Sequence, residues 1–304
     1  AGFLVSALAG LREYRRLATL GAEIRGGAED RMLTQVPVWR YREAVRLLTL
    51  RELRVRYSNS ALGVVWSLIA PLAMTLVFTV IYGVVVPSPQ PAYPVFFLAG
   101  LLPWNFFSLA LTSSTQSITG NGNLVKRVYF PREILPISVV LAIGINFLVA
   151  LIPLAVLMIA YGVPFTPALI WVIPILATQI VLSIGLGLGL SALNTLFRDV
   201  QQMVDILILP LFFATPVFYD LSLVQNATVR AVLTIGNPMA GLVSAYRAAI
   251  YSGQAPDSFT LGVAAIEAVA LLLIGCAVES PLWSFGRRMG RHSVGFTVSP
   301  LITV

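Results

Sequence analysis

Acidic side chains inside apolar segments are the groups best suited to chemistry in this chain, and one apolar segment holds two of them. Glu267 and Glu279 lie within residues 259–281. On one helix they are separated by about 18 Å of rise, whereas carboxylates that cleave a glycosidic bond together lie about 5–9.5 Å apart. They do not form a hydrolytic pair. A carboxylate within a membrane is a functional candidate by default, but a hydrogen bond to a polar neighbour on another helix explains Glu267 equally well.

Residue counts exclude metal and nucleotide sites of the common kinds. Cys276 and His292 are the only cysteine and the only histidine, and a structural zinc site needs four such ligands. A Walker loop needs Gly-Lys followed by Ser or Thr, but Lys126 is the only lysine and Val125 precedes it. We therefore expect no catalytic residue, no metal and no cofactor in this chain, which is not an enzyme on its own.

The repeated "GLGLGL" at residues 185–190 is a third pattern that could suggest nucleotide binding. Gly185 and Gly189 are four residues apart in an apolar helix, and small residues at this spacing let two membrane helices approach closely. We expect a helix-packing face here.

The residues around these few groups are those of a membrane protein. Apolar residues make up 58% of the 304 positions and charged residues 11%, against roughly 45–50% and about 25% in soluble domains. No charged residue or histidine occurs from Tyr57 to Val125 or from Ile134 to Phe197. Soluble helices need a charged outer face, and a charge at the bilayer centre costs about 2.5–3.5 kcal/mol. The predicted fold class is an all-α integral membrane protein.

Six transmembrane helices fit the two charge-free runs and the apolar segments after them, because about 20 apolar residues cross a bilayer. Prolines and glycines within 87–94 and 162–167 divide the runs. The expected spans are 62–86, 94–116, 135–160, 168–194, 203–219 and 259–281.

Residues 221–256, between spans five and six, hold two apolar stretches, 229–235 and 238–250, that are too short to cross a membrane. Non-spanning backbone is tolerated at membrane depth where protein or water covers it. We expect two short re-entrant helices here. An extracellular loop with surface helices is the alternative.

The arginine distribution predicts the orientation. Basic residues gather within 12–56, within 126–132, at Arg198 and within 287–291, which all fall on one side of a six-span topology. The positive-inside rule makes that side cytoplasmic and places both termini there. The membrane accounts for the basic residues, so no nucleic-acid partner is expected.

An amphipathic helix precedes the first span. Val38, Tyr41, Val45 and Leu48 share one face at helical spacing, and an arginine-rich helix of this kind lies in the membrane interface. The expected organisation is a cytoplasmic segment at 1–35, the interfacial helix at 36–57, the six-helix transmembrane domain at 58–282 and a cytoplasmic tail at 283–304.

Aromatic residues concentrate in spans one, two and five. A ring face offers a sugar a broad contact that tolerates sliding, so these residues could line a translocation path. Ordinary packing, and the preference of Trp and Tyr for membrane interfaces, explain each residue separately as well. The predicted path residues are Phe78, Tyr82, Trp104, Phe107, Phe212, Phe218 and Tyr219.

Four segments, in this order, resemble the permease subunit of ABC-type polysaccharide exporters, the type-2 exporters of O-antigen, teichoic acid and related cell-envelope glycans. They are "RELRVRYSNSALGVVWSLIAPL" at 51–72, "NLVKRVYFPREILP" at 123–136, "FRDV" at 197–200 and "NPMAGLVSAYR" at 237–247. The first 35 residues and the tail after Arg291 do not match the family pattern.

This resemblance implies a homodimer in the bacterial plasma membrane that works with two copies of a cytoplasmic ATPase subunit, which bind ATP and Mg²⁺. The cargo would be a lipid-diphosphate-linked polysaccharide taken from the cytoplasmic side.

Three groups of site residues follow from the resemblance. The predicted ATPase-coupling residues are Lys126, Arg127, Phe130, Pro131, Arg132 and Glu133. The predicted lipid-diphosphate residues are Arg40, Arg42, Arg46, Arg51, Arg54 and Arg56, although positive-inside topology alone also explains these arginines. The predicted outer-gate residues are Asn237, Pro238, Tyr246 and Arg247.

Three other functions compete with polysaccharide export. An ABC-type drug or lipid exporter permease is the nearest. An ion-coupled secondary transporter usually has ionisable groups near the membrane midplane and repeated halves, but only Glu267 and Asp205 are available and no repeat is visible. An integral-membrane glycosyltransferase would need clustered acidic or metal-binding residues.

Overall fold

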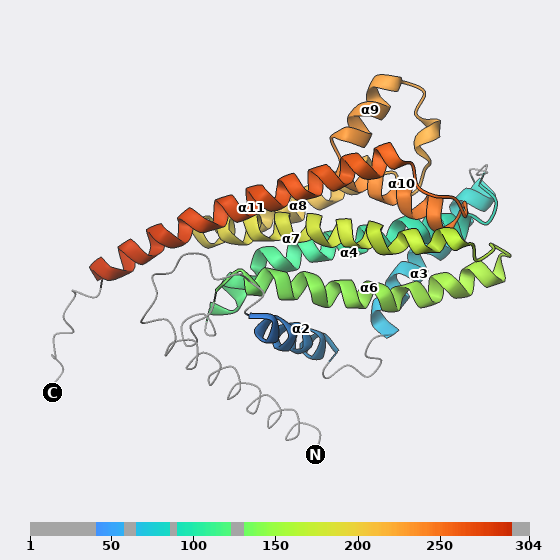
Figure 1. Ribbon diagram of the computed structural model, residues 1–304. Helices are drawn as coiled ribbons and strands as arrows, with labels where there is room; N and C mark the ends of the chain where they lie inside the picture. The colour runs from blue at the N-terminus through green and yellow to red at the C-terminus, as the bar shows by residue number, and fades with distance from the viewer. Residues whose placement is uncertain (1–40, 58–64, 86–89, 123–130, 294–304) are drawn as a thin grey trace, which may run out of the picture.

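The structure is a computed structural model that describes residues 41–57, 65–85, 90–122 and 131–293, and every regular element in these ranges is a helix (Figure 1). The predicted all-α class is confirmed for this part of the chain. The elements are α2 (Arg42–Tyr57), α3 (Val65–Val80), η2 (Ile81–Val85), α4 (Tyr93–Gly120), α6 (Ile134–Ala160), η3 (Pro167–Trp171), α7 (Val172–Leu196), α8 (Val200–Ala214), η4 (Leu221–Leu223), α9 (Ala227–Ile235), α10 (Pro238–Ile250) and α11 (Ser258–Ser293).

Four helical segments of the described ranges are long and apolar enough to cross a membrane: Tyr93–Gly120, Ile134–Ala160, Pro167–Leu196 and Ser258–Glu279. They coincide with predicted spans two, three, four and six. Two shorter apolar helices, at Leu68–Gly83 and Val200–Ala214, lie where spans one and five were expected.

Helix α8 ends earlier than predicted, at Ala214 instead of near residue 219. The physical reason is a proline. Thr215 precedes Pro216, and the ring of a proline disfavours helical backbone in the residue before it. Thr215 accordingly has extended backbone, with φ −90° and ψ 133°.

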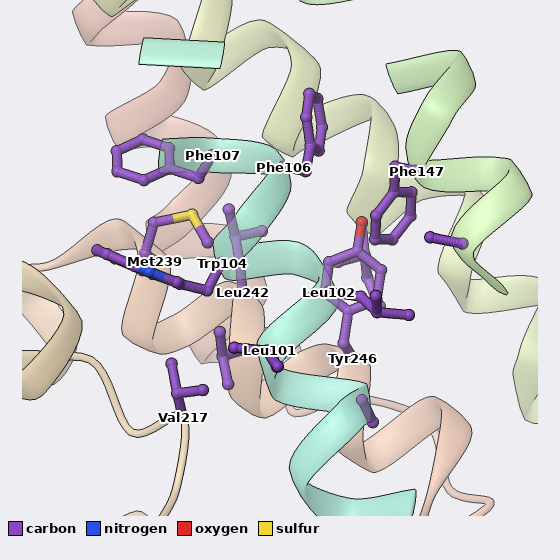
Figure 2. Close-up of a cluster of buried hydrophobic side chains, with 14 of the residues drawn as sticks. Leu101, Leu102, Trp104, Phe106, Phe107, Phe147, Val217, Met239, Leu242 and Tyr246 are labelled. Atoms are coloured by element: carbon purple, nitrogen blue, oxygen red, sulfur yellow. The ribbon is translucent and has the colours of Figure 1, made fainter. Parts of the chain in front are cut away.

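Helix α4 lies at the centre of the bundle and contacts α3, α6, α7, α8 and α10. Figure 2 shows the core that it builds, in which Trp104 and Phe107 lie near Met239 of α10 and Phe106 lies near Phe147 of α6. This core is the frame that holds the polar and aromatic groups described below.

Helices α7 and α11 approach closely at three glycines, two on α7 and one on α11. A Cβ atom added to Gly275 would lie 2.1 Å from the Gly185 carbonyl oxygen, and one added to Gly189 would lie 3.6 Å from the Gly275 Cα. The predicted packing face at Gly185 and Gly189 is therefore confirmed.

The two short helices between α8 and α11 have opposite environments. Helix α10 is packed against α4, α7 and α11, and most of its side chains are buried. Helix α9 projects from the bundle (Figure 1), and its described side chains are exposed or partly exposed. The alternative prediction of a surface helix therefore fits α9 but not α10.

Helix α2 packs its apolar face on the beginning of α6. Leu47 and Leu48 form a small core with Ile134 and Leu135, against which Tyr41 is partly buried. The predicted apolar face is confirmed for Tyr41, for Val45 and for Leu48, whereas Val38 lies outside the described residues. The location of α2 in the membrane interface remains a prediction.

Candidate functional site

A cavity of about 620 Å³ lies between α2, α3, α4 and α6. Its polar lining comes from three helices and consists of Arg56, Tyr57, Asn105, Ser108 and Asn146. The remaining walls are mostly apolar, formed by Ala70, Pro71, Leu102, Phe106, Leu109, Ile143, Phe147 and Ala150. A cavity whose lining combines a guanidinium and two amides with apolar side chains suits an amphiphile with an anionic head.

The end of α2 is fixed beside this cavity by a hydrogen bond between helices. The Tyr57 hydroxyl donates to Asn146 Oδ1 on α6. Asn105 and Asn146 each lie twelve residues, or about 18 Å of rise, from one end of their helix. Sequence reasoning missed both asparagines, although a polar residue deep in an apolar span is the signal that could have identified them.

The predicted lipid-diphosphate arginines are spread along α2. Arg42, Arg46, Arg54 and Arg56 are exposed, and among them Arg56 lines the cavity. Arg40 lies outside the described residues. The sixth, Arg51, is partly buried.

The remaining polar contacts of these arginines differ in strength. The Arg51 guanidinium donates to Asn121 Oδ1 at 3.1 Å and ties α2 to the end of α4. Arg46 lies 3.9 Å from the Glu43 carboxylate, and both side chains are exposed, so this pair adds little stability.

The predicted translocation-path residues form one aromatic cluster between α3, η2, α4, the end of α8 and the segment that follows α8. Phe78 stacks on Phe97, with ring centroids 4.7 Å apart, and Tyr82 stacks on Tyr93 at 4.9 Å. The Phe218 ring lies 6.2 Å from that of Phe78. Phe97 and Tyr93 were not predicted, and they join the rings of α3 to those of α4.

Exposure divides the predicted path residues into two groups. Trp104 and Phe107 are buried, and Trp104 joins the cluster through Phe212 at a centroid distance of 5.6 Å. The partly exposed members are Phe78, Tyr82, Phe212, Phe218 and Tyr219. The second group is accessible on this single chain, whereas the first is part of its core.

Arg247 of α10 holds the chain segment that follows α8. Its Nη1 donates to the carbonyl oxygens of Pro216 at 2.5 Å and Tyr219 at 2.9 Å, and its Nη2 donates to that of Val217. Its Nε donates to the Phe96 carbonyl at 3.2 Å, and its Cζ lies 3.7 Å from the centroid of the Phe96 ring. The buried guanidinium is thus surrounded by backbone oxygens, which compensate for the loss of water.

The other predicted outer-gate residues begin and stabilise the same helix. Asn237 caps α10, because its Oδ1 accepts from the Met239 N–H at 3.1 Å and its Nδ2 donates to Thr215 Oγ1 at 2.9 Å. Pro238 occupies the first helical position, where proline is favoured. Tyr246 is fully buried beside Phe147 (Figure 2), with ring centroids 5.7 Å apart. Asn237 and Arg247 therefore hold the same segment, 215–219, from two ends.

The predicted ATPase-coupling residues are described only in part, since Lys126, Arg127 and Phe130 lie outside the described residues. Pro131, Arg132 and Glu133 form the turn that enters α6, where the Leu135 N–H donates to the Arg132 carbonyl at 3.0 Å. Burial raises the pKa of the Glu133 carboxyl and lowers the pKa of the Arg132 guanidinium. Both shifts mean that the charged forms are partly desolvated.

The acidic candidates of α11 lie apart from these groups. Glu267 is partly buried, and its Oε2 atom has no hydrogen-bond partner among the described residues. Glu279 is 1% exposed. No group of three or more His, Cys, Asp or Glu residues suited to a metal ion occurs in the described ranges.

Comparison with known proteins gives consistent matches. Residues 43–251 match the family described as ABC-2 type transporter. Over 235 residues the chain is 35% identical to the O-antigen export system permease protein RfbA of Myxococcus xanthus, which covers 77% of this chain and 90% of the relative. A protein of the same name from Klebsiella pneumoniae is 30% identical over 239 residues, which cover 78% of this chain and 90% of the relative. The polysialic acid transport protein KpsM of Escherichia coli is 27% identical over 243 residues, with 77% and 91% covered.

Proposed function

The chain belongs to the ABC-2 type transporter family and is similar to permeases of polysaccharide exporters, and from this we propose that it exports a lipid-diphosphate-linked polysaccharide across the bacterial plasma membrane. In this proposal two copies of the chain form the pathway, and a separate ATPase subunit hydrolyses ATP. The sequence supports the separate ATPase because its single lysine, Lys126, is not preceded by glycine.

The cavity beside α2 is the observation that carries the lipid-linked part of the proposal. A lipid diphosphate has an anionic head and an apolar tail, and the cavity lining combines Arg56 and other polar groups with apolar side chains. Arginine binds phosphate through several donors at fixed geometry. The Asn105 and Asn146 amides add neutral hydrogen-bonding groups.

The aromatic cluster supports passage of the glycan. Phe78, Tyr82 and Phe218 present partly exposed rings in one continuous cluster. The face of an aromatic ring contacts a sugar ring over a broad area, and this contact restricts the orientation of the sugar only weakly. In the proposed dimer these rings face the path, and the segment held by Arg247 forms its outer end.

The turn into α6 supports coupling to the ATPase. In the proposal Pro131, Arg132 and Glu133, together with the residues before them, fit a groove of the ATPase subunit on the cytoplasmic side. Proline makes the turn rigid, and arginine offers bidentate contacts to a carboxylate. Both termini of the chain lie on this side in the proposed topology.

A matched pair of variants on α2 tests the proposal. Arg56→Ala removes the charge from the cavity, whereas Arg42→Ala removes the same charge from an exposed position at the other end of the helix. Loss of a charged hydrogen bond to phosphate costs about 1.5–3 kcal/mol, so we expect Arg56→Ala to reduce the rate of glycan export about tenfold or more while Arg42→Ala exports almost normally.

The measurement follows glycan on the surface of cells that depend on this chain, together with lipid-linked glycan retained inside. Equal export by the two variants would refute the role of this cavity in binding the lipid diphosphate. Cells that accumulate no lipid-linked glycan when the chain is deleted would refute glycan export itself. Equal amounts of both variants in the membrane, measured by immunoblot, would show that a difference in export does not come from folding.

A further inference from the structure

A second pocket, of about 490 Å³, is lined by polar residues of three helices and has no role in the function proposed so far. It lies where α4 and α7 end and α8 begins. Its lining consists of Gln116, Thr119, Asn194, Thr195, Arg198 and Gln201. In a chain with 58% apolar residues, a lining made up of amide, hydroxyl and guanidinium side chains suits a ligand rich in hydroxyl groups better than a lipid tail.

Asn194 builds this pocket by joining the three helices. It is 4% exposed, and its Nδ2 donates to the Thr115 carbonyl at 3.0 Å and to Thr119 Oγ1 at 3.3 Å on α4. Its Oδ1 accepts from the Gln201 backbone N–H at 3.3 Å at the start of α8. All three bonds cross between helices or turns, so the pocket walls are held in fixed positions before any ligand arrives.

Gln201 supplies a polar atom that lacks a partner. Its Nε2 donates to Asp205 Oδ1 at 3.0 Å, while its Oε1 is buried and has no hydrogen-bond donor in the described part of the chain. A buried carbonyl oxygen without a donor costs about 1–3 kcal/mol. Because this oxygen is itself buried, a hydroxyl group of a ligand satisfies it only when the Gln201 side chain turns toward the pocket.

We propose that this pocket binds a sugar residue of the exported glycan, preferably one that carries a carboxylate or phosphate. This inference rests on the proposed function. Amides and hydroxyls each donate and accept hydrogen bonds, which matches the hydroxyls of a sugar ring. Arg198 is the charged member of the lining, and it favours an acidic substituent. The volume lies within the range of about 300–1,000 Å³ of small-ligand sites.

Sugar binding to the full-length protein in detergent tests the inference, with glucuronic acid and glucose as probes in saturation-transfer NMR. We expect glucuronic acid to bind more tightly than glucose, and Gln116→Ala to weaken both about fivefold, which corresponds to one hydrogen bond of about 1 kcal/mol. Arg198→Ala is expected to abolish the preference for glucuronic acid. Gln116 and Arg198 are exposed, so we expect both variants to fold with little loss of stability. Gln202→Ala, exposed on α8 outside the pocket, is the control.

Each result decides the inference separately from the proposed function. Saturation transfer that is unchanged in Gln116→Ala and in Arg198→Ala, or absent with both sugars, overturns the sugar site and leaves glycan export untouched. Unchanged sugar binding with loss of a copurifying ATPase in Arg198→Ala shows that the pocket is a subunit contact, which also overturns it. Loss of sugar binding together with slower glycan export, in cells that do export glycan, supports it.

Discussion

Replacing Arg247 with lysine is the most informative single change, because it keeps the positive charge and removes the planar guanidinium with its several N–H donors. In the structure the guanidinium donates to the carbonyls of Phe96, Pro216, Val217 and Tyr219. These acceptors belong to two separate segments, α4 and residues 216–219. A lysine has a single nitrogen at one point, so at most part of the set can be satisfied after Arg247→Lys.

The magnitude follows from the lost contacts. A hydrogen bond to a charged group contributes about 1.5–3 kcal/mol, and a buried carbonyl left without a donor costs about 1–3 kcal/mol. The Phe96 ring, 3.7 Å from the Arg247 Cζ, adds about 1–2 kcal/mol of cation–π attraction. If two of the carbonyls lose their donor, the folded state is destabilised by about 3–5 kcal/mol, which is also the cost of breaking a buried charged pair.

The assay is unfolding of the purified protein in mixed micelles, together with proteolysis of the segment 215–226. Arg230→Lys is the matched control, because Arg230 is exposed on α9 and the substitution is the same. We expect Arg247→Lys to shift the unfolding midpoint strongly and to open the segment to protease, whereas Arg230→Lys stays within about 0.5 kcal/mol of wild type. If the two variants unfold alike, the argument from the carbonyl set is refuted.

Two further predictions concern helix packing and ATPase coupling. Gly275→Ala places a Cβ 2.1 Å from the Gly185 carbonyl oxygen, where a carbon–oxygen distance of about 3.3–3.6 Å is normal. Helices α7 and α11 must therefore separate, and we expect the free energy of unfolding to fall by about 3 kcal/mol. Gly262→Ala on the same helix meets no atom within 4 Å and is the control in the same unfolding assay. The double variant Arg132→Glu with Glu133→Arg exchanges the two residues and keeps the net charge, so we expect normal membrane insertion. We also expect weaker copurification of the ATPase and slower export. Unimpaired export would show that this turn serves only to fix the topology of the chain.

Much of the architecture could be predicted from the sequence, because it depends on local chemistry. The lack of charge over long runs indicates which residues form apolar helices. Prolines mark some of the helix ends, although Pro71, Pro103, Pro153 and Pro210 lie inside helices. The stretches predicted at 229–235 and 238–250 are α9 and α10. The boundary that was wrong, the end of α8, also had a local cause in Pro216, which sequence reasoning overlooked.

The partners of individual side chains could not be predicted in this way. Helices that are apolar on all sides give no periodic signal for the face that points inward, and lipid tails are as apolar as a protein core. The family resemblance therefore predicts Arg247 as an outer-gate residue, but the sequence does not indicate its hydrogen bonds to the carbonyls of Pro216, Val217 and Tyr219. It likewise contains Tyr57 and Asn146 without indicating their hydrogen bond across two helices.

By itself the sequence determined that this chain is a helical membrane protein, which segments are helices, that no Walker loop is present, and which exporter family it resembles. Only the tertiary structure decided that Arg56 lines an amphiphilic cavity, that the rings of α3 and α4 form one cluster, and that Asn194 joins three helix ends around a polar pocket. The reason is physical: composition and spacing act within a segment, whereas these sites depend on the rotation and crossing of helices that are far apart in the chain.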